Sequence, residues 1–145
     1  MISISSSQQA MRVPRKRLAE LVAFVARRQH ARLGEVDIAV VTGRQIAGLN
    51  REYLHRRGPT DVLSFDLSTS PEAPLTAQIV VCADLAVREA HRRGHGPQRE
   101  LMLYVVHALL HLLGYDDDTA PNAARMHARE DELLEQFRRR RRRTR

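Results

Sequence analysis

The feature that most constrains the fold is an apolar segment, residues 101–113, that carries two histidines. Apart from Tyr104, His107 and His111, every residue of this segment is Leu, Met, Val or Ala. The four-residue spacing of the histidines places both side chains on the same face of an α-helix. Gly114 follows, and glycine readily adopts the left-handed conformation that ends a helix. The segment therefore predicts a buried helix after which the chain turns back toward its own histidines.

The turn after this helix supplies a carboxylate, Asp117. Two histidines and one carboxylate make a three-ligand metal site that keeps its fourth position open, as in catalytic zinc sites. We therefore expect His107, His111 and Asp117 to bind one zinc ion. Asp116 is a rival third ligand, and His127 is a more remote one. An oxygen ligand makes the site harder, so manganese or magnesium is also conceivable, although less favoured than zinc.

The outline HxxxHxxGxxD is similar to a zinc-protease pattern. In those proteases a glutamate follows the first histidine and acts as general base. Ala108 occupies that position here. Ala108 therefore disfavours the interpretation of the chain as a metalloprotease or a related metal-dependent hydrolase.

The length and the cysteine content favour one cytoplasmic domain. A chain of 145 residues buries enough apolar surface for a single core. No stretch of about 18 or more apolar residues is present, and residues 1–17 lack the apolar segment of a signal peptide. The single cysteine, Cys82, excludes an internal disulfide and fits a reducing compartment. Cys82 lies in a strand-like run, where we expect a small buried apolar residue.

The basic charge of the chain is concentrated at its end. Residues 138–145 hold seven arginines, which account for the whole formal net charge of +7. Such a run is usually solvated and disordered, and it is also the composition of an arm that binds phosphate backbones without sequence preference. We therefore expect a single domain over residues 1–137, followed by a disordered arginine-rich tail over residues 138–145.

The periodicity of the chain predicts an α+β domain. Thr42 and Gln45 form a capping box pattern, Asp84 is a candidate helix cap, and Pro97 suits the first position of the histidine helix. Helical spacing covers residues 15–29, 42–53, 84–91, 97–113 and 123–137, and strand-like composition covers residues 36–41, 61–65 and 77–82. We expect a small mixed β-sheet packed with helices, in which the central helix carries the metal-binding histidines, as in zincin-like folds.

Two motifs in a fixed order connect these segments to a known family. The first motif spans 107–117 and contains His107, Leu110, His111, Leu112, Gly114, Tyr115 and Asp116. The second contains Leu49, Asn50 and Tyr53, followed by the complete run PTDVLSF over residues 59–65. These motifs resemble HGxLHLxGYDH and LNxxYR…PTDVLSF of the YbeY family of bacterial metal-dependent endoribonucleases. The resemblance runs from about residue 36 to residue 137.

Two departures from the family pattern fall where its chemistry lies. The third histidine of the family is Asp117 here, and the arginine after the tyrosine, associated with the substrate phosphate, is Leu54. Aspartate ligates zinc at roughly 2.0–2.2 Å, but it lowers the charge of the site and so acidifies a bound water less. Leucine offers a phosphate no hydrogen bond. Arg56 and Arg57 are the candidate substitutes for the missing arginine.

The resemblance implies hydrolysis of single-stranded RNA in ribosomal RNA maturation and ribosome quality control. It also implies a cytoplasmic protein whose partners are ribosomal RNA and the small ribosomal subunit, with no membrane association. The alternative is a ribosome-associated RNA-binding factor of the same fold with weakened catalysis. Leu54 favours that alternative, whereas the intact pair His107 and His111 favours the enzyme.

Overall fold

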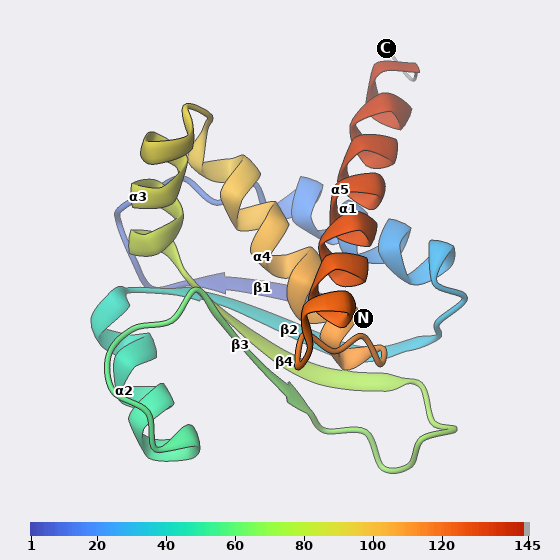
Figure 1. Ribbon diagram of the computed structural model, residues 1–145, viewed down its shortest axis with the longest axis horizontal. Coiled ribbons are helices and arrows are strands. Elements are labelled where there is room, and N and C mark those ends of the chain that lie inside the picture. The colour runs from blue at the N-terminus through green and yellow to red at the C-terminus, as the bar shows by residue number, and fades with distance from the viewer. Residues whose placement is uncertain (144–145) are drawn as a thin grey trace.

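The computed structural model describes the backbone of residues 1–143 and the side chains of residues 1–140. These residues form one α+β domain (Figure 1), so the expected fold class is confirmed. The strands are β1 (Ile2–Ser6), β2 (Leu33–Val41), β3 (Val62–Asp66) and β4 (Leu75–Cys82). The helices are α1 (Arg15–Arg28), α2 (Gly43–Leu54), α3 (Ala83–Arg93), α4 (Pro97–Leu112) and α5 (Ala120–Arg143).

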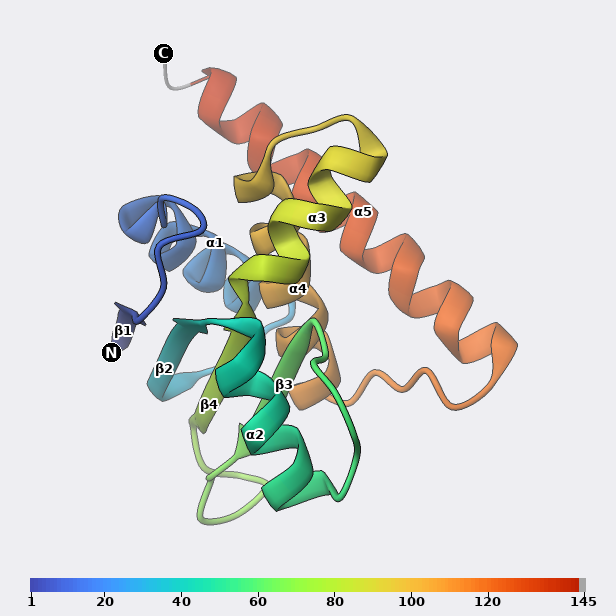
Figure 2. The ribbon, with the colours of Figure 1, turned by 90° about the vertical axis from the view of Figure 1, so that its left-hand side faces the viewer.

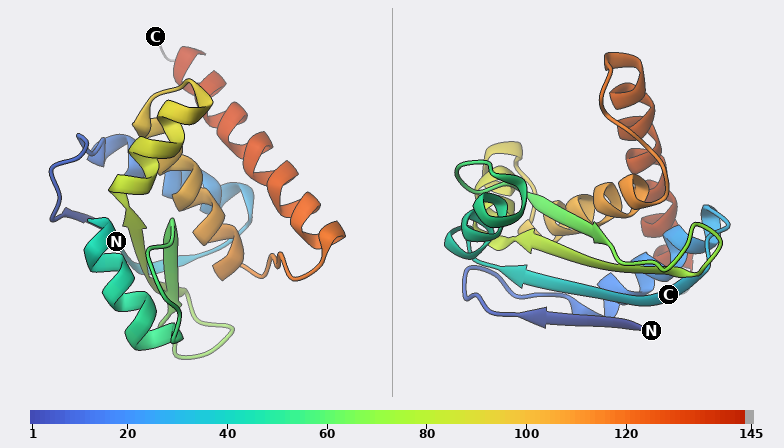
Figure 3. Two further views of the ribbon diagram at one scale, coloured as in Figure 1. Left: turned by 60° about the vertical axis from the view of Figure 1, so that its left-hand side comes forward. Right: turned by 90° about the horizontal axis from the view of Figure 1, so that it is seen from below.

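The four strands make one mixed sheet in the order β1-β2-β4-β3 (Figure 3, right). The pairs β1–β2 and β2–β4 are parallel, and β3 joins the edge of the sheet antiparallel to β4. Strand β1 was not among the expected elements. Its register places Ile2 beside Val36 and Ile4 beside Ile38, so its alternating Ile and Ser residues extend the hydrophobic face of β2.

Helices cover the two faces of the sheet unequally. The main core joins α1, α4 and α5 to one face of β2 and β4. A smaller core lies on the opposite face, where Ile46 of α2 packs with Leu63 of β3 and Val80 of β4. Figure 2 shows α2 in front of the sheet and α1, α4 and α5 behind it. Helix α4 is therefore held between the sheet and α5.

Local signals set the two ends of α4. Pro97 occupies the first turn, as expected, and the helix ends at Leu112. Gly114 has φ of +109°, the conformation that favours glycine. The Tyr115 N–H donates to the carbonyl of Leu110 at 2.9 Å, so the chain folds back over the last helical turn.

Helix α5 is longer than expected and extends into the arginine run. It begins at Ala120 and continues to Arg143, so the arginine run is helical as far as that residue. Arg139 pairs with Glu135 at 3.1 Å, and the Arg140 guanidinium lies 5.7 Å from the centre of the Phe24 ring. The first arginines therefore pack with the domain, and residues 144 and 145 lie outside the described part of the chain.

Three further local predictions can be compared with the structure. Cys82 is fully buried, and burial raises the pKa of its thiol, which fits the small apolar role. Asp84 does not cap α3, so that expectation was wrong. Its Oδ2 instead accepts a hydrogen bond from the Gly43 N–H at 2.5 Å, because the start of α2 lies across from it. Thr42 and Gln45 do form the expected capping box.

No helix within residues 1–143 combines the length and the apolar character that spanning a bilayer requires.

Candidate metal centre

The histidine pair occupies the one open side of a helix that is otherwise largely buried. Leu101, Val105 and Leu109 of α4 are buried in the main core. The His107 side chain is 28% exposed, and His111 is exposed. The predicted spacing therefore does place both imidazoles on one side of α4, at the surface of the domain.

Each imidazole is oriented through its Nδ1 atom. His107 Nδ1 lies 2.5 Å from Glu130 Oε1, and His111 Nδ1 lies 3.2 Å from the carbonyl oxygen of Tyr115. A carboxylate and a carbonyl both accept hydrogen bonds, so Nδ1 is the donor in each ring. The lone pair then resides on Nε2, for which neither histidine has a hydrogen-bond partner among the described residues. Metal-ligating histidines are oriented in this way.

Glu130 of α5 is the central residue of this arrangement. It is 2% exposed, and its second oxygen lies 3.3 Å from Nδ1 of His127. The His127 ring stacks on His107, with ring centres 6.5 Å apart. A buried carboxylate is costly unless it is hydrogen-bonded. Glu130 joins α5 to α4 through His107, and His127 of its own helix contacts its second oxygen. His127 is thus remote in sequence but close in space.

Sequence reasoning missed Glu130, although a signal for it exists. Met126, Leu133 and Phe137 mark the buried side of α5, and Glu130 falls at helical spacing among them. A carboxylate on an apolar stripe needs a partner inside the protein. This position therefore indicates a buried polar contact, but its partner follows only from the packing of α5 on α4.

The surroundings of His107 favour positive charge. The hydrogen bond with Glu130 raises the pKa of His107 above its ordinary value, and the negative charges of Glu130, Asp61 and Asp117 act in the same direction, while partial burial opposes them. Asp61 also accepts a hydrogen bond from the Val62 N–H at 2.8 Å, where β3 begins. The same field that favours a proton on His107 favours a metal cation beside it.

The third ligand is not assembled in this structure. Within residues 1–143, no three His, Cys, Asp or Glu side chains are gathered closely enough to hold a metal ion. Asp117 lies exposed in the loop between α4 and α5, and its charge acts on His107. The Nδ1 atoms of His107 and His111 are both hydrogen-bonded, so two of the expected ligands are oriented and the expected third, Asp117, is not beside them.

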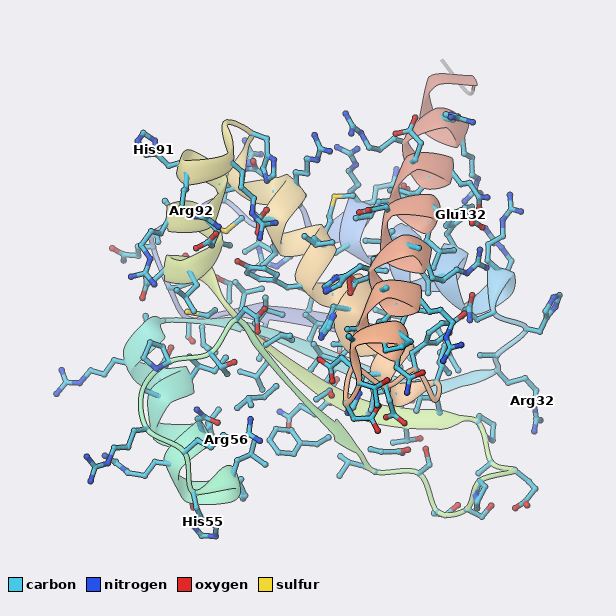
Figure 4. The ribbon with its side chains drawn as sticks, viewed as in Figure 1. Arg32, His55, Arg56, His91, Arg92 and Glu132 are labelled. Carbon is cyan, nitrogen blue, oxygen red and sulfur yellow. The ribbon has the colours of Figure 1, made fainter. Side chains whose placement is uncertain are left out.

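Arg56 and Arg57 lie in the loop between α2 and β3. Both are exposed, and neither forms an ion pair or a hydrogen bond with the histidines in the described part of the chain. Figure 4 shows Arg56 beside α2. Leu54, the last residue of α2, is 45% exposed, so the position of the family's arginine faces solvent.

A sizeable groove lies next to the histidine helix rather than around the histidines. Its volume is about 840 Å³, and Leu112 and Gly114 border it together with the α1–β2 turn and the β3–β4 loop. Neither His107 nor His111 lines it. The candidate metal centre is therefore separate from this groove, and its histidines are accessible from the surface.

Replacing Glu130 with glutamine is expected to lower metal affinity about 10–100-fold, the usual effect of losing the partner of a ligand. Without the carboxylate, His107 loses its fixed Nδ1–H tautomer. Metal competition with a chromophoric chelator measures the affinity, and ¹⁵N NMR of the imidazole reports the tautomer in the metal-free protein.

The matched control for this change is Glu132→Gln on the exposed side of α5. Glu132 is 54% exposed and pairs only with Arg129 among the described residues, and Figure 4 shows it on the outer side of α5. Equal metal affinities of the two variants would show that Glu130 serves only the packing of α5.

Known proteins are similar to this chain over nearly its whole length. The family model described as Endoribonuclease YbeY matches residues 3–138. A Nocardioides protein described as Endoribonuclease YbeY is 38% identical over 132 residues, which cover 85% of this chain and 89% of the relative. A Bacillus licheniformis protein of the same description is 35% identical over 140 residues, covering 87% and 89%. A Moorella thermoacetica relative is 43% identical over 110 residues, covering 69% and 70%.

A solved structure supports the fold independently. The solution structure of a Thermotoga maritima protein matches with a TM-score of 0.65 at 23% sequence identity, covering 94% of this chain and 89% of that chain. The four-stranded sheet with its helices is therefore a fold shared with a distant protein.

Proposed function

This chain belongs to the YbeY endoribonuclease family, and from that premise we propose that it is a metal-dependent endoribonuclease specific for single-stranded RNA. We place its action in ribosomal RNA maturation and ribosome quality control. The observation that carries the proposal is the pair His107 and His111, whose Nδ1 atoms are both hydrogen-bonded while their Nε2 atoms have no hydrogen-bond partner in the described part of the chain.

The proposed metal ligands are His107, His111 and Asp117, and the proposed ion is zinc, with manganese or magnesium as less favoured ions. The chemistry that a bound divalent ion supplies is neutralisation of phosphate charge and a lowered pKa for a water molecule. The two imidazoles offer Nε2, and Glu130 holds His107 in the matching tautomer. Asp117 completes the set when its loop closes onto α4.

The charge of the site supports metal dependence. Glu130, Asp61 and Asp117 all act electrostatically on His107, and three carboxylates repel an RNA phosphate. A divalent cation reverses that repulsion, because it adds two positive charges at the point where the phosphodiester must lie. Arg56 and Arg57, exposed in the α2–β3 loop, are the candidate substitutes for the family's arginine at the flanking phosphates.

The proposed partners are ribosomal RNA and the small ribosomal subunit, in the cytoplasm. Association with the ribosome brings single-stranded RNA segments to a site that has no deep pocket of its own. This part of the proposal rests on the family alone.

The experiment is cleavage of one labelled RNA, either single-stranded or annealed to its complement, by purified protein of measured metal content. We expect cleavage of the single strand only, its loss on chelation, and its recovery on addition of zinc. Cleavage that is unchanged by chelation, or equal on the duplex, would contradict the proposal.

A second candidate function is the RNA-binding factor with weakened catalysis. Exposed Leu54 favours it, since leucine cannot contact a phosphate as a guanidinium does. RNA binding without cleavage at any metal content would select this function over the enzyme.

The arginine run offers a separate test of RNA binding. Arg140 lies over Phe24, so truncation after Arg140 removes positive charge while preserving that contact. We expect the shortened protein to fold as before and to bind RNA with a weaker dependence on salt. Each lost phosphate contact lowers the slope of log affinity against log salt by roughly 0.7 on a single strand. An unchanged slope in filter-binding titrations would show that residues 141–145 do not contact RNA.

A further inference from the structure

An unusual surface lies at the end of α2 and in the loop that follows it. All residues from 51 to 59 are exposed. Among the described residues, four large apolar side chains are exposed, namely Met1, Tyr53, Leu54 and Leu67. Two of them, Tyr53 at 58% and Leu54 at 45%, are neighbours in this stretch. An isolated exposed apolar residue needs no explanation, whereas an aromatic ring inside a basic segment indicates a binding surface.

The Tyr53 ring is held in place from one side. Its centre lies 5.7 Å from that of Phe65, and the rings meet edge to face at 70°. Phe65 belongs to β3 and packs against the smaller core. Tyr53 is therefore supported from within the protein while more than half of its surface faces solvent. A supported ring loses little conformational entropy when a flat ligand stacks on it.

The loop beyond Tyr53 is also anchored. Asn50, which is 4% exposed, donates from Nδ2 to the carbonyl of Gly58 at 3.1 Å, and its own carbonyl accepts from the Arg56 N–H at 3.3 Å. Gly58 has φ of +82°, which lets the loop reverse there. These contacts fix the backbone of the loop that carries Arg56 and Arg57.

The charge around the ring is positive. Arg51, Arg56 and Arg57 are exposed and have no ion-pair partner in the described part of the chain, and Glu52 is the one acidic residue of the stretch 51–59. A stacking ring flanked by guanidinium groups is the combination that binds single-stranded nucleic acid. Every base offers a flat face for stacking, and the arginines contact the adjoining phosphates. In a duplex the base faces are already stacked on one another, so a duplex would contact only the arginines and not the ring.

We propose that Tyr53 is a stacking site for one unpaired base of the RNA strand, with Arg51, Arg56 and Arg57 binding the phosphates beside it. This inference rests on the proposed RNA substrate and extends it to a named base-binding residue. Residues 55–61 lead from α2 to β3, and β3 packs against α4, the helix that carries His107 and His111. A strand stacked on Tyr53 can therefore follow this loop to the candidate metal centre.

The experiment compares Tyr53→Ala, Tyr53→Phe and Arg56→Gln in the metal-loaded full chain. Rapid-mixing fluorescence anisotropy gives the dissociation constant of a labelled single-stranded RNA at several salt concentrations. Loss of one stacked base weakens binding about 5–100-fold without changing the salt slope, whereas Tyr53→Phe keeps the ring and binds as the native chain does. Arg56→Gln lowers the slope by roughly 0.7. Tyr53 is exposed, so circular dichroism should show an unchanged fold.

An RNA with abasic sites supplies the decisive control. If Tyr53 stacks on a base, Tyr53→Ala weakens binding of the normal RNA but not of the abasic RNA. An equal effect on both RNAs, or no effect on either, overturns the inference while the proposed function stands. Absence of RNA binding by the native chain overturns both. Unchanged RNA affinity together with lost binding to purified small ribosomal subunits would assign this surface to a protein partner instead.

Discussion

Replacing His111 with alanine is expected to remove the bound metal and to lower the rate of RNA cleavage by about three orders of magnitude. Loss of a Lewis acid removes several kcal/mol of transition-state stabilisation, and each 1.4 kcal/mol corresponds to about a tenfold change in rate. His111 is exposed, and its hydrogen bond with Tyr115 is local to the end of α4. The change therefore removes a ligand without opening the core.

The measurement is metal content by mass spectrometry together with single-turnover cleavage of a labelled single strand. His91→Ala is the matched control, because His91 is an exposed histidine at the end of α3, away from α5 (Figure 4). The control should keep native metal content and native rate. A His111→Ala protein with full metal and full activity would place the ligands elsewhere.

His111 is a cleaner position for this test than His107. Removing the His107 imidazole leaves the buried Glu130 without its shorter hydrogen bond, which lies at 2.5 Å in the native chain. An unsatisfied buried acceptor typically costs about 1–3 kcal/mol of stability. A rate loss in His107→Ala would therefore combine metal loss with destabilisation of the packing between α4 and α5 (Figure 3, left).

The elements that local sequence determines were predictable. The spacing of His107 and His111, the proline at the start of α4 and the glycine after it act within a few residues, and the structure confirms each of them. The capping box of Thr42 and Gln45 is equally local and is also present. In these cases the interaction that decides the structure lies inside the window that a sequence pattern can show.

The errors fall where distant partners decide the structure. Strand β1 gains its stability by pairing with β2, some 34 residues later in the register of Ser3 and Asp37. Asp84 turns to the start of α2 instead of capping its own helix. Arg140 likewise lies over Phe24 across the domain, a contact that no local pattern in the sequence shows.

The same distinction applies to the candidate site. The two histidines follow from local spacing, whereas Glu130 lies 23 residues from His107 and reaches it only because α5 packs on α4. The family's motifs marked the positions of Leu54 and Asp117 as departures. Their consequences depend on how a substrate and a metal meet those positions, and so Asp117 as third ligand remains a prediction.

The two departures can be ranked by restoring each family residue. We expect Leu54→Arg to raise cleavage of single-stranded RNA by about 10²–10³, the usual effect of one positioned donor at a charged transition state. Leu54 is exposed at the end of α2, so an arginine fits there without disturbing the core. Asp117→His should give the smaller gain, since aspartate already ligates zinc and costs only part of the acidity of the site.

The comparison requires both variants at equal metal loading, with rates taken from single-turnover cleavage. Leu67→Arg is the matched control, because Leu67 is 59% exposed and lies after β3, outside both motifs. An added positive charge that acts only through general attraction for RNA would raise the rate equally at positions 54 and 67. If Asp117→His gives the larger gain, the acidity of the metal site limits the reaction. If Leu54→Arg gives the larger gain in rate and Leu67→Arg gives none, the missing phosphate contact limits the rate of cleavage. Only an arginine beside the anchored α2–β3 loop then reaches the reacting phosphate.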